Sequence, residues 1–236
     1  MALYRDQGIV LRTYKLGEAD RIVTFITERH GKVRAVAKGV RKTKSKFGAR
    51  LEPTSHVALQ LYEGRELDIV TQAESIDHFK PIREDLDRLT RAVTMLEAVD
   101  QLSLEREPNP DLYRMLLGAL RTVAAKNSAL VVAGFHWKIL ALEGFRPQVE
   151  GCVVCDTPDG LVSFDPTEGG LLCGEHRRGT RVSPEAVELL QQILGGRLAL
   201  ALQAESSPAT HEVDHLATRV MEHHLERRLR SVGLLD

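Results

Sequence analysis

The chain has 236 residues, of which 43% are hydrophobic and 28% charged, and its formal net charge is −1. This composition is typical of a globular protein with one large domain or two small ones. No apolar run approaches the roughly 20 residues that cross a bilayer, and the first residues lack a secretory apolar core. We therefore expect a cytoplasmic protein with no membrane partner.

Positive charge is concentrated near the start of the chain. Residues 1–50 contain 13 Lys or Arg against four Asp or Glu, and the rest of the chain compensates for this excess. Residues 38–50, KGVRKTKSKFGAR, hold six Lys or Arg and no acid. Such asymmetry indicates a polyanion-binding end attached to a neutral or acidic body.

Residues 1–78 are predicted to form a five-stranded β-barrel. Short segments rich in Val, Ile and Thr are separated by turn residues, and they cover residues 8–14, 20–28, 32–40, 55–62 and 67–73. Five short strands in about 70 residues fit an OB-fold barrel, a Greek-key barrel or an SH3-like barrel. The basic stretch then connects the third and fourth strands.

Residues 79–236 are predicted to form an all-α domain, which makes the protein an α+β multidomain chain. The first helix, residues 82–105, places five apolar side chains on one face: Leu86, Leu89, Val93, Leu96 and Val99. Further helices are predicted at residues 108–126, 128–145, 183–194 and 211–232. The segment 128–145 is apolar almost all round, which indicates a buried central helix. Ser183 and Pro184 have the residue types of a helix cap and first turn.

A small zinc-finger-like insert is predicted at about residues 146–180. Cys152 and Cys155 form a CxxC pair, and Cys173 and His176 form a CxxH pair after 17 intervening residues. Two close pairs of S and N ligands are typical of a closed, tetrahedral, structural Zn²⁺ site. The alternative is a chance grouping of buried cysteines, but all three cysteines of the chain fall into the pattern.

A second metal motif is weaker. HEVDH, residues 211–215, matches the HExxH pattern of zinc peptidases, in which Glu212 would act as a base. The segment ESSPAT precedes it, so His211 would lie in the first turn of a helix. The extended motif also fails, because Thr218 and Met221 occupy its later positions. We interpret these residues as solvated polar groups at a helix start.

Three interpretations compete for residues 38–50. A charge run is by default a solvated loop. A membrane-surface patch would need an amphipathic helix, which Gly39 and Gly48 disfavour. A phosphate-binding loop fits better, because Phe47 can stack on a base while lysines and arginines contact the backbone. The candidate DNA-binding residues are Arg12, Arg21, Lys32, Arg34, Lys38, Arg41, Lys42, Lys44, Lys46, Phe47 and Arg50.

Two motifs make the chain similar to the RecO family of bacterial DNA repair and recombination mediators. Leu16 to Lys32 resembles the pattern LGExDRIVTxxTxxxGK, and Ala37 to Phe47 resembles AKGxR(K/R)xKS(K/R)F, followed by Leu51 to Pro53. Downstream, ALEGFRPQVEGCVVC and FDPTEGGLLC resemble the helix end and zinc module of the family. The likeness covers nearly the full chain.

The resemblance implies an OB-fold domain, a helical domain and one structural Zn²⁺, and it implies that the protein is not an enzyme. It further implies binding of ssDNA and dsDNA without sequence specificity, annealing of complementary strands, and action at the nucleoid. The implied partners are RecR, the single-strand-binding protein (SSB) and, indirectly, RecA, which the protein helps to load onto SSB-coated strands. His176 departs from the family, in which the fourth ligand is often Cys. A rival hypothesis is an adaptor that binds proteins and no DNA.

Overall fold

The structure, a computed structural model, describes residues 2–229 and 231. These residues divide into two compact units, with the boundary between Ala125 and Lys126. The change from strands to helices lies between Asp77 and Lys80, and the first unit contains both the barrel and the first three helices. In this part of the chain, no helix is long and apolar enough to cross a membrane.

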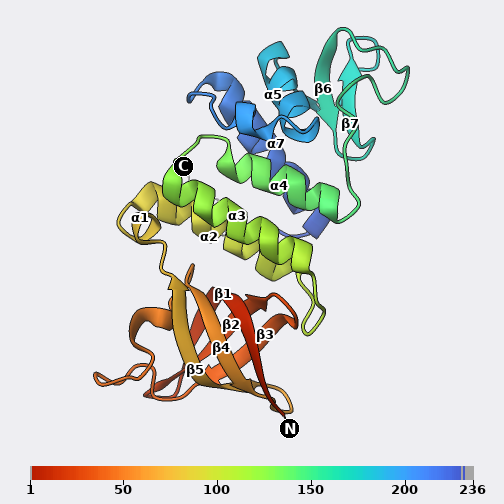
Figure 1. Cartoon of the computed structure of the whole chain (residues 1–236). Coiled ribbons are helices and arrows are strands. Elements are labelled where there is room, and N and C mark those ends of the chain that lie inside the picture. Colours follow the sequence, from red (N-terminus) through yellow and green to blue (C-terminus); the bar gives the residue numbers. More distant parts are fainter. Residues whose placement is uncertain (1, 230, 232–236) are drawn as a thin grey trace. The chain divides into compact units, whose positions relative to one another are not determined.

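The first unit begins with a closed barrel whose strand order is β1-β2-β3-β5-β4 (Figure 1). Its strands are β1 (Leu3–Leu16), β2 (Asp20–Thr27), β3 (Gly31–Ala37), β4 (His56–Tyr62) and β5 (Asp68–Asp77). The strand β1 is longer than predicted because its first half pairs with β4 and its second half with β2. All pairs are antiparallel except β3 and β5, which pair in parallel. The five predicted strands are confirmed, and the closed five-stranded order agrees with an OB-type barrel.

Alternate side chains of these strands fill the barrel. The core contains Val10, Val23, Phe25, Val33, Ala35, Ala37, Phe47, Leu51, Val57, Leu59, Leu61, Val70 and Ala73. Two of these, Phe47 and Leu51, come from the segment between β3 and β4, where a short 3-10 helix, η1 (Gly48–Leu51), forms at the end of the predicted loop. The basic stretch is therefore anchored in the barrel core at one end.

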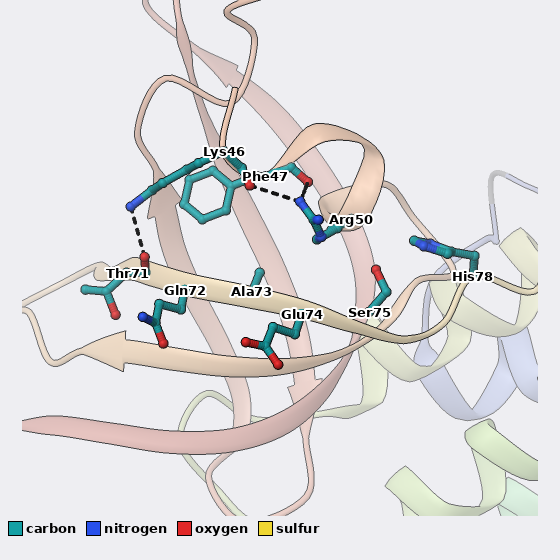
Figure 2. A pocket seen from close by; sticks show the side chains of 9 residues that line it. All are labelled: Lys46, Phe47, Arg50, Thr71, Gln72, Ala73, Glu74, Ser75 and His78. Atoms are coloured by element: carbon teal, nitrogen blue, oxygen red, sulfur yellow. Dashed lines mark hydrogen bonds between the residues drawn. The ribbon is translucent and has the colours of Figure 1, made fainter. Parts of the chain in front are cut away.

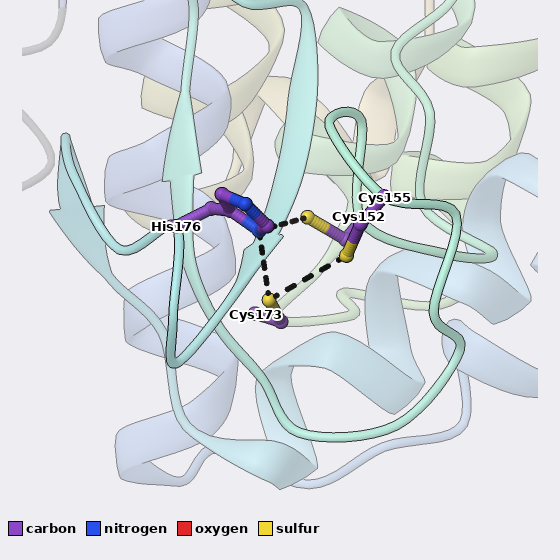
Figure 3. A group of neighbouring side chains, drawn as sticks. All are labelled: Cys152, Cys155, Cys173 and His176. Atoms are coloured by element: carbon purple, nitrogen blue, oxygen red, sulfur yellow. Dashed lines mark hydrogen bonds between the residues drawn. The ribbon is translucent and has the colours of Figure 1, made fainter.

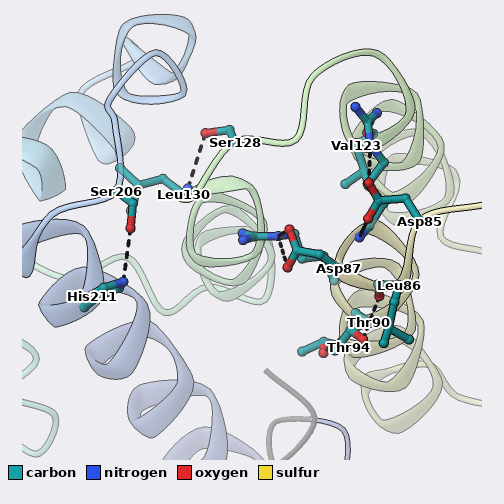
Figure 4. Close-up of polar contacts among 12 residues, drawn as sticks. Asp85, Leu86, Asp87, Thr90, Thr94, Val123, Ser128, Leu130, Ser206 and His211 are labelled. Carbon is teal, nitrogen blue, oxygen red and sulfur yellow. Dashed lines mark hydrogen bonds and ion pairs between the residues drawn. The ribbon is translucent and has the colours of Figure 1, made fainter. Parts of the chain in front are cut away.

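Three helices complete the first unit: α1 (Lys80–Arg83), α2 (Leu86–Leu102) and α3 (Pro110–Ala125). The helix predicted from residue 82 is broken at Asp85, whose carboxylate accepts a hydrogen bond from the Arg88 amide and caps α2. Inside α2, Thr90 and Thr94 each donate to the carbonyl four residues earlier (Figure 4). These local hydrogen bonds satisfy the threonine hydroxyls within the helix.

The prediction that the apolar face begins at the first residue of α2 is wrong. Leu86 is 80% exposed, although Leu96 and Val99 are buried as predicted. The helix α2 packs against β1, α1 and α3, so its buried face is wider than one stripe. That face consists of Thr90, Ala92, Thr94, Met95, Leu96, Ala98 and Val99.

The segment between α2 and α3 is docked on the barrel. The Arg106 amide donates to the Lys32 carbonyl at 2.9 Å, and a bridge pairs Lys32 with Glu105. A Cβ added to Gly31, whose φ is +65°, would lie 1.9 Å from the Glu107 carbonyl oxygen. Only glycine permits this close approach of two backbones.

The second unit surrounds one buried helix, α4 (Val131–Leu142), as predicted. The other elements are β6 (Leu161–Asp165), β7 (Gly170–Cys173), β8 (Thr180–Arg181), α5 (Pro184–Leu194), α6 (Leu198–Ala201) and α7 (Pro208–Leu225). Ser183 caps α5, as predicted, and Ser207 caps α7 in a capping box. The helix α7 thus begins before His211 and ends at Leu225, and residues 230 and 232 of the predicted helix lie outside the described part.

The cysteine-bearing insert contains a three-stranded sheet, β7-β6-β8, that the sequence pattern did not predict. Leu161, Phe164, Leu171 and Leu172 are buried, and the Phe164 ring lies 5.6 Å from the Trp137 ring of α4. The insert therefore has apolar contacts with the helices of its own unit, in addition to any metal site.

The helix α4 carries a fully buried histidine. Neither ring nitrogen of His136 has a hydrogen-bond partner among the described residues, and the same holds for Nε1 of the neighbouring Trp137. Burial lowers the pKa of His136 to about 4, because a charged imidazolium is poorly solvated there. The ring is neutral in the folded protein near pH 7.

This burial predicts a loss of stability in acid. The unfolded chain binds a proton at His136 below its ordinary pKa of 6.5, whereas the folded chain does so only near pH 4. The free energy of unfolding should therefore fall as the pH decreases from about 6.5 to 4, by on the order of 3 kcal/mol from this group. Urea unfolding followed by the fluorescence of Trp137, the single tryptophan, measures the effect. The variant His136→Leu should show a shallower pH dependence than the wild type, and equal slopes would contradict the prediction.

Candidate nucleic-acid interface and metal centre

Residues 38–50, the basic loop, are tied to the turn between β1 and β2. The Gly39 amide donates to the Asp20 carboxylate at 2.7 Å, and the Arg41 amide donates to the Ala19 carbonyl at 3.0 Å. The Arg41 side chain also donates to the carbonyls of Gly17 and Glu18. Together with the buried Phe47, these bonds hold both ends of the loop against the barrel.

Seven of the predicted DNA contacts form hydrogen bonds or ion pairs with acids or carbonyls of the protein itself: Arg12, Arg21, Lys32, Arg34, Arg41, Lys46 and Arg50. Arg12 pairs with Asp100 at 2.8 Å, Arg21 with Glu52 at 2.8 Å, and Arg34 with Glu105 at 3.4 Å. Lys32 donates from its half-buried side chain to the Asp100 carbonyl at 2.6 Å. Exposed ion pairs contribute little to stability, so Arg21 and Arg34 can exchange a carboxylate for a phosphate more readily than Lys32.

Two cations of the basic loop line an open pocket of about 530 Å³ beside β5 (Figure 2). Lys46 Nζ donates to the Thr71 carbonyl at 2.9 Å, and Arg50 donates to the carbonyls of Lys46 and Phe47. Glu74 lies in the same wall. Lys46 thus ties the loop to β5, and Arg50 bonds within the loop itself; both charges face a mixed polar surface.

Three lysines of the basic loop differ from the other predicted contacts. The side chains of Lys38, Lys42 and Lys44 are exposed and make no hydrogen bond or ion pair within the described part of the chain. Their positive charge is not neutralised by a protein acid, which leaves them available to a polyanion.

Phe47 packs in the core. Its side chain is 1% exposed among Val10, Phe25 and other barrel residues, and Lys46 Nζ lies 5.0 Å from the ring centroid. A buried ring cannot stack on a base without leaving the barrel, so the predicted stacking contact is replaced by a packing contact. Tyr14, which the sequence pattern did not single out, is instead 50% exposed at the end of β1.

The four predicted metal ligands lie together in the second unit (Figure 3). Cys155 Sγ is 3.8 Å from Cys173 Sγ, and His176 Nδ1 is 3.8 Å from Cys152 Sγ and 3.3 Å from Cys173 Sγ. All four ligand atoms lie within 4.8 Å of one another, so the group can hold a metal ion. The residues come from a turn before β6 and from the end of β7 and the turn after it.

The surroundings favour the thiolate, the form that binds metal, at Cys152 and Cys173. At Cys155 the Thr157 amide lowers the pKa, but burial and the two neighbouring cysteines outweigh it and raise the pKa. Burial raises the pKa of the Cys152 thiol, but backbone amides, beginning with that of Cys173, outweigh this and lower the pKa to about 6. The His176 amide likewise lowers the pKa of the Cys173 thiol below its ordinary value. Metal coordination needs deprotonated sulfur, which these N–H groups stabilise.

The HEVDH motif does not form a second metal site in the described residues. His211 and His215 are both exposed, and His211 Nε2 lies 3.2 Å from the Ser206 hydroxyl (Figure 4). The Glu212 carboxylate accepts a hydrogen bond from the Ser183 amide at 2.8 Å. Glu212 therefore secures the start of α5, where a peptidase would need it free as a base.

Comparisons with known proteins agree with these features. Residues 1–79 match the family model described as "Recombination protein O N terminal", and residues 83–232 match "Recombination protein O C terminal". The chain is 44% identical to "DNA repair protein RecO" from Nocardioides sp., over 99% of each chain.

The burial of Phe47 predicts a stability effect. Phe47→Ala should destabilise the barrel by about 3–5 kcal/mol, because it leaves a cavity in a closed core. Hydrogen exchange of the barrel strands, read by mass spectrometry, measures this loss, and Phe47→Leu should retain most of the protection. A fully protected barrel in Phe47→Ala, combined with weaker DNA binding, would instead support a stacking role.

Proposed function

The chain belongs to the RecO family of DNA repair proteins, and from this membership we propose that it is a DNA-binding recombination mediator. It binds ssDNA and dsDNA without sequence specificity, anneals complementary strands and is not an enzyme. With RecR it assists the loading of RecA onto strands coated by SSB. It acts in the cytoplasm at the nucleoid. The family likeness supports these partners and this location.

One observation carries the DNA-binding part of the proposal: three unpaired lysines, Lys38, Lys42 and Lys44, project from a loop fixed at both ends. A phosphate backbone presents charges at regular spacing, and neutralising them releases counterions. Such contacts read charge and spacing but no base edges, so the binding is independent of sequence. Arg41 lies in the same loop, and Arg21 and Arg34 lie on the adjoining strands, where each would have to exchange its glutamate for a phosphate.

Annealing follows from this chemistry without a catalytic group. Two complementary strands repel each other through their phosphates, and a basic surface that neutralises both raises their local concentration. Base pairing then selects the partner strand. Nothing in this sequence of events breaks a covalent bond or consumes a nucleotide.

We propose one structural Zn²⁺ at Cys152, Cys155, Cys173 and His176. Three sulfurs and one imidazole nitrogen are a donor set that zinc prefers. Ligands at about 2.3 Å for S and 2.0–2.1 Å for N around a tetrahedral ion lie about 3.8 Å apart from S to S and about 3.6 Å from S to N. Three of the six separations between ligand atoms are 3.3–3.8 Å, close to these values, and all lie within 4.8 Å. The bound ion would cross-link the two ends of the insert, and no vacancy remains for a substrate.

Removal of the free charges tests the DNA interface. The triple variant Lys38→Ala, Lys42→Ala, Lys44→Ala should bind every ssDNA sequence more weakly, and its salt slope should fall by about 2, or roughly 0.7 per lost phosphate contact. Fluorescence anisotropy with labelled ssDNA across a salt series gives both quantities.

The matched control removes the same charge at the exposed residues Lys80, Arg114 and Lys126. That variant should keep the wild-type slope. If the two triple variants behave alike, or if the wild type has no salt-dependent affinity, the basic loop is not a phosphate-binding loop and the adaptor hypothesis is favoured.

Metal analysis tests the zinc site. The wild type should contain about one Zn²⁺ per chain, and Cys152→Ser should lose it together with the hydrogen-exchange protection of β6 and β7. The double variant His211→Ala, His215→Ala should keep its zinc. Zinc loss in the histidine variant, with retention in Cys152→Ser, would reverse the assignment of the two motifs.

A further inference from the structure

Tyr14 is an exposed aromatic beside the basic loop. Among the described aromatics of the first unit, Tyr14 and Tyr62 are exposed by more than a third, at 50% and 38%. They lie at opposite ends of β1, because Tyr62 pairs with Leu3 at its start. Only Tyr14 is next to the turn that the basic loop contacts through Gly39 and Arg41. Packing in the core does not explain why an aromatic side chain at this place is half exposed to solvent.

The ring belongs to an apolar row on the outer surface of the barrel. Tyr14 pairs with Ile22 of β2, and Ile22 pairs with Val36 of β3. Their neighbours along β2 and β3, Val23 and Ala35, point into the core, so the row faces outward. Ile22 and Val36 are half-buried, and paired side chains on one face of a sheet lie about 5 Å apart. Tyr14, Ile22 and Val36 together form a flat apolar strip, the Tyr14 platform.

Arg12 holds the ring in place. Its guanidinium carbon lies 4.9 Å from the Tyr14 ring centroid, and its Nη1 donates to the Tyr14 hydroxyl. The same guanidinium is held by Asp100 through Nε. An aromatic group fixed in this way loses little conformational entropy when a ligand stacks on it.

Cations flank the platform on two sides. The next cross-strand row is Arg12, Thr24 and Arg34, and on the other side β3 runs into Lys38 and the basic loop. Arg12 and Arg34 are paired with Asp100 and Glu105, whereas the lysines on the other side have no ion pair among the described residues. An apolar strip next to such lysines complements a single-stranded nucleic acid, whose flat bases alternate with phosphates. A protein partner of ordinary composition would leave the exposed lysines of the basic loop, Lys38, Lys42 and Lys44, without counterparts.

We propose that Tyr14 is the base-stacking residue of the DNA interface and that the Tyr14 platform binds unpaired bases. This inference rests on the proposed DNA binding and specifies which form of DNA the protein prefers. Phosphate contacts are available from single and double strands alike, whereas stacking on Tyr14 requires a base that is free of its partner. The platform therefore makes the protein prefer ssDNA.

The test compares three ligands of equal length: oligo(dT), an oligomer with abasic sites at every position, and a duplex. Tyr14→Ala should bind oligo(dT) about 5- to 150-fold more weakly, the range that alanine substitution of one stacking aromatic gives. Its affinity for the abasic strand and the duplex, and its salt slope, should stay near the wild-type values. Tyr14→Phe, which keeps the ring, should bind oligo(dT) like the wild type.

The matched control is Tyr62→Ala, which removes an exposed tyrosine at the other end of β1 and should change none of the three affinities. Thermal melting of each variant verifies the fold. If Tyr14→Ala weakens all three ligands equally, or none of them, the platform proposal is wrong while the phosphate-binding proposal stands. If the wild type itself binds none of the three ligands, the proposed function fails.

Discussion

A single buried carboxylate couples the closure of the barrel to the docking of the helices. Asp68 is fully buried and accepts hydrogen bonds from Arg106 Nη2 at 2.6 Å, from the Gly64 amide at 3.0 Å and from the Tyr4 hydroxyl. It also pairs with Ala35 in the short parallel contact that closes the barrel between β3 and β5. A buried charge costs several kcal/mol unless it is paired and hydrogen-bonded, so the barrel needs Arg106 from the segment between α2 and α3. Burial and the nearby Asp68 carboxylate raise the pKa of Tyr4, which keeps its hydroxyl as a donor.

This docking also decides which cations remain free for a ligand. The end of α2 and the following segment bring Asp100 and Glu105 to the outer face of β1, β2 and β3, where they pair with Arg12, Lys32 and Arg34. Farther along the same strands Tyr14 stays exposed, and Lys38, Lys42 and Lys44 of the basic loop make no ion pair among the described residues. The proposed interface is thus the part of this outer sheet surface whose positive charges Asp100 and Glu105 do not neutralise.

The sequence patterns correctly predicted the features that depend on residues close together in the chain. The five strands, the Ser183 cap and the CxxC and CxxH pairs each depend on residues a few positions apart, and each is present. The exposure of Leu86, the burial of Phe47 and the pairing of Lys32 with Asp100 depend on residues tens of positions apart, which periodicity does not encode. Phe47 shows the difference clearly. A lone aromatic among six cations suggests base stacking, but in the structure its ring packs in the barrel core. The strands β6 to β8 were not predicted, because each has five residues or fewer and is too short to show a clear alternating pattern.

The separate roles proposed for the lysines and for the Tyr14 platform have a consequence for the proposed annealing. Phosphate contacts alone favour a duplex, which carries about twice the charge density of a single strand, so a purely basic surface would retain its product. A base stacked on Tyr14 must leave the ring before it can pair, and the paired base cannot return to it. Stacking thus stabilises the separate strands on the protein and is lost in the duplex. The proposed interface can therefore concentrate two strands and still release them once paired, with base pairing as the source of free energy.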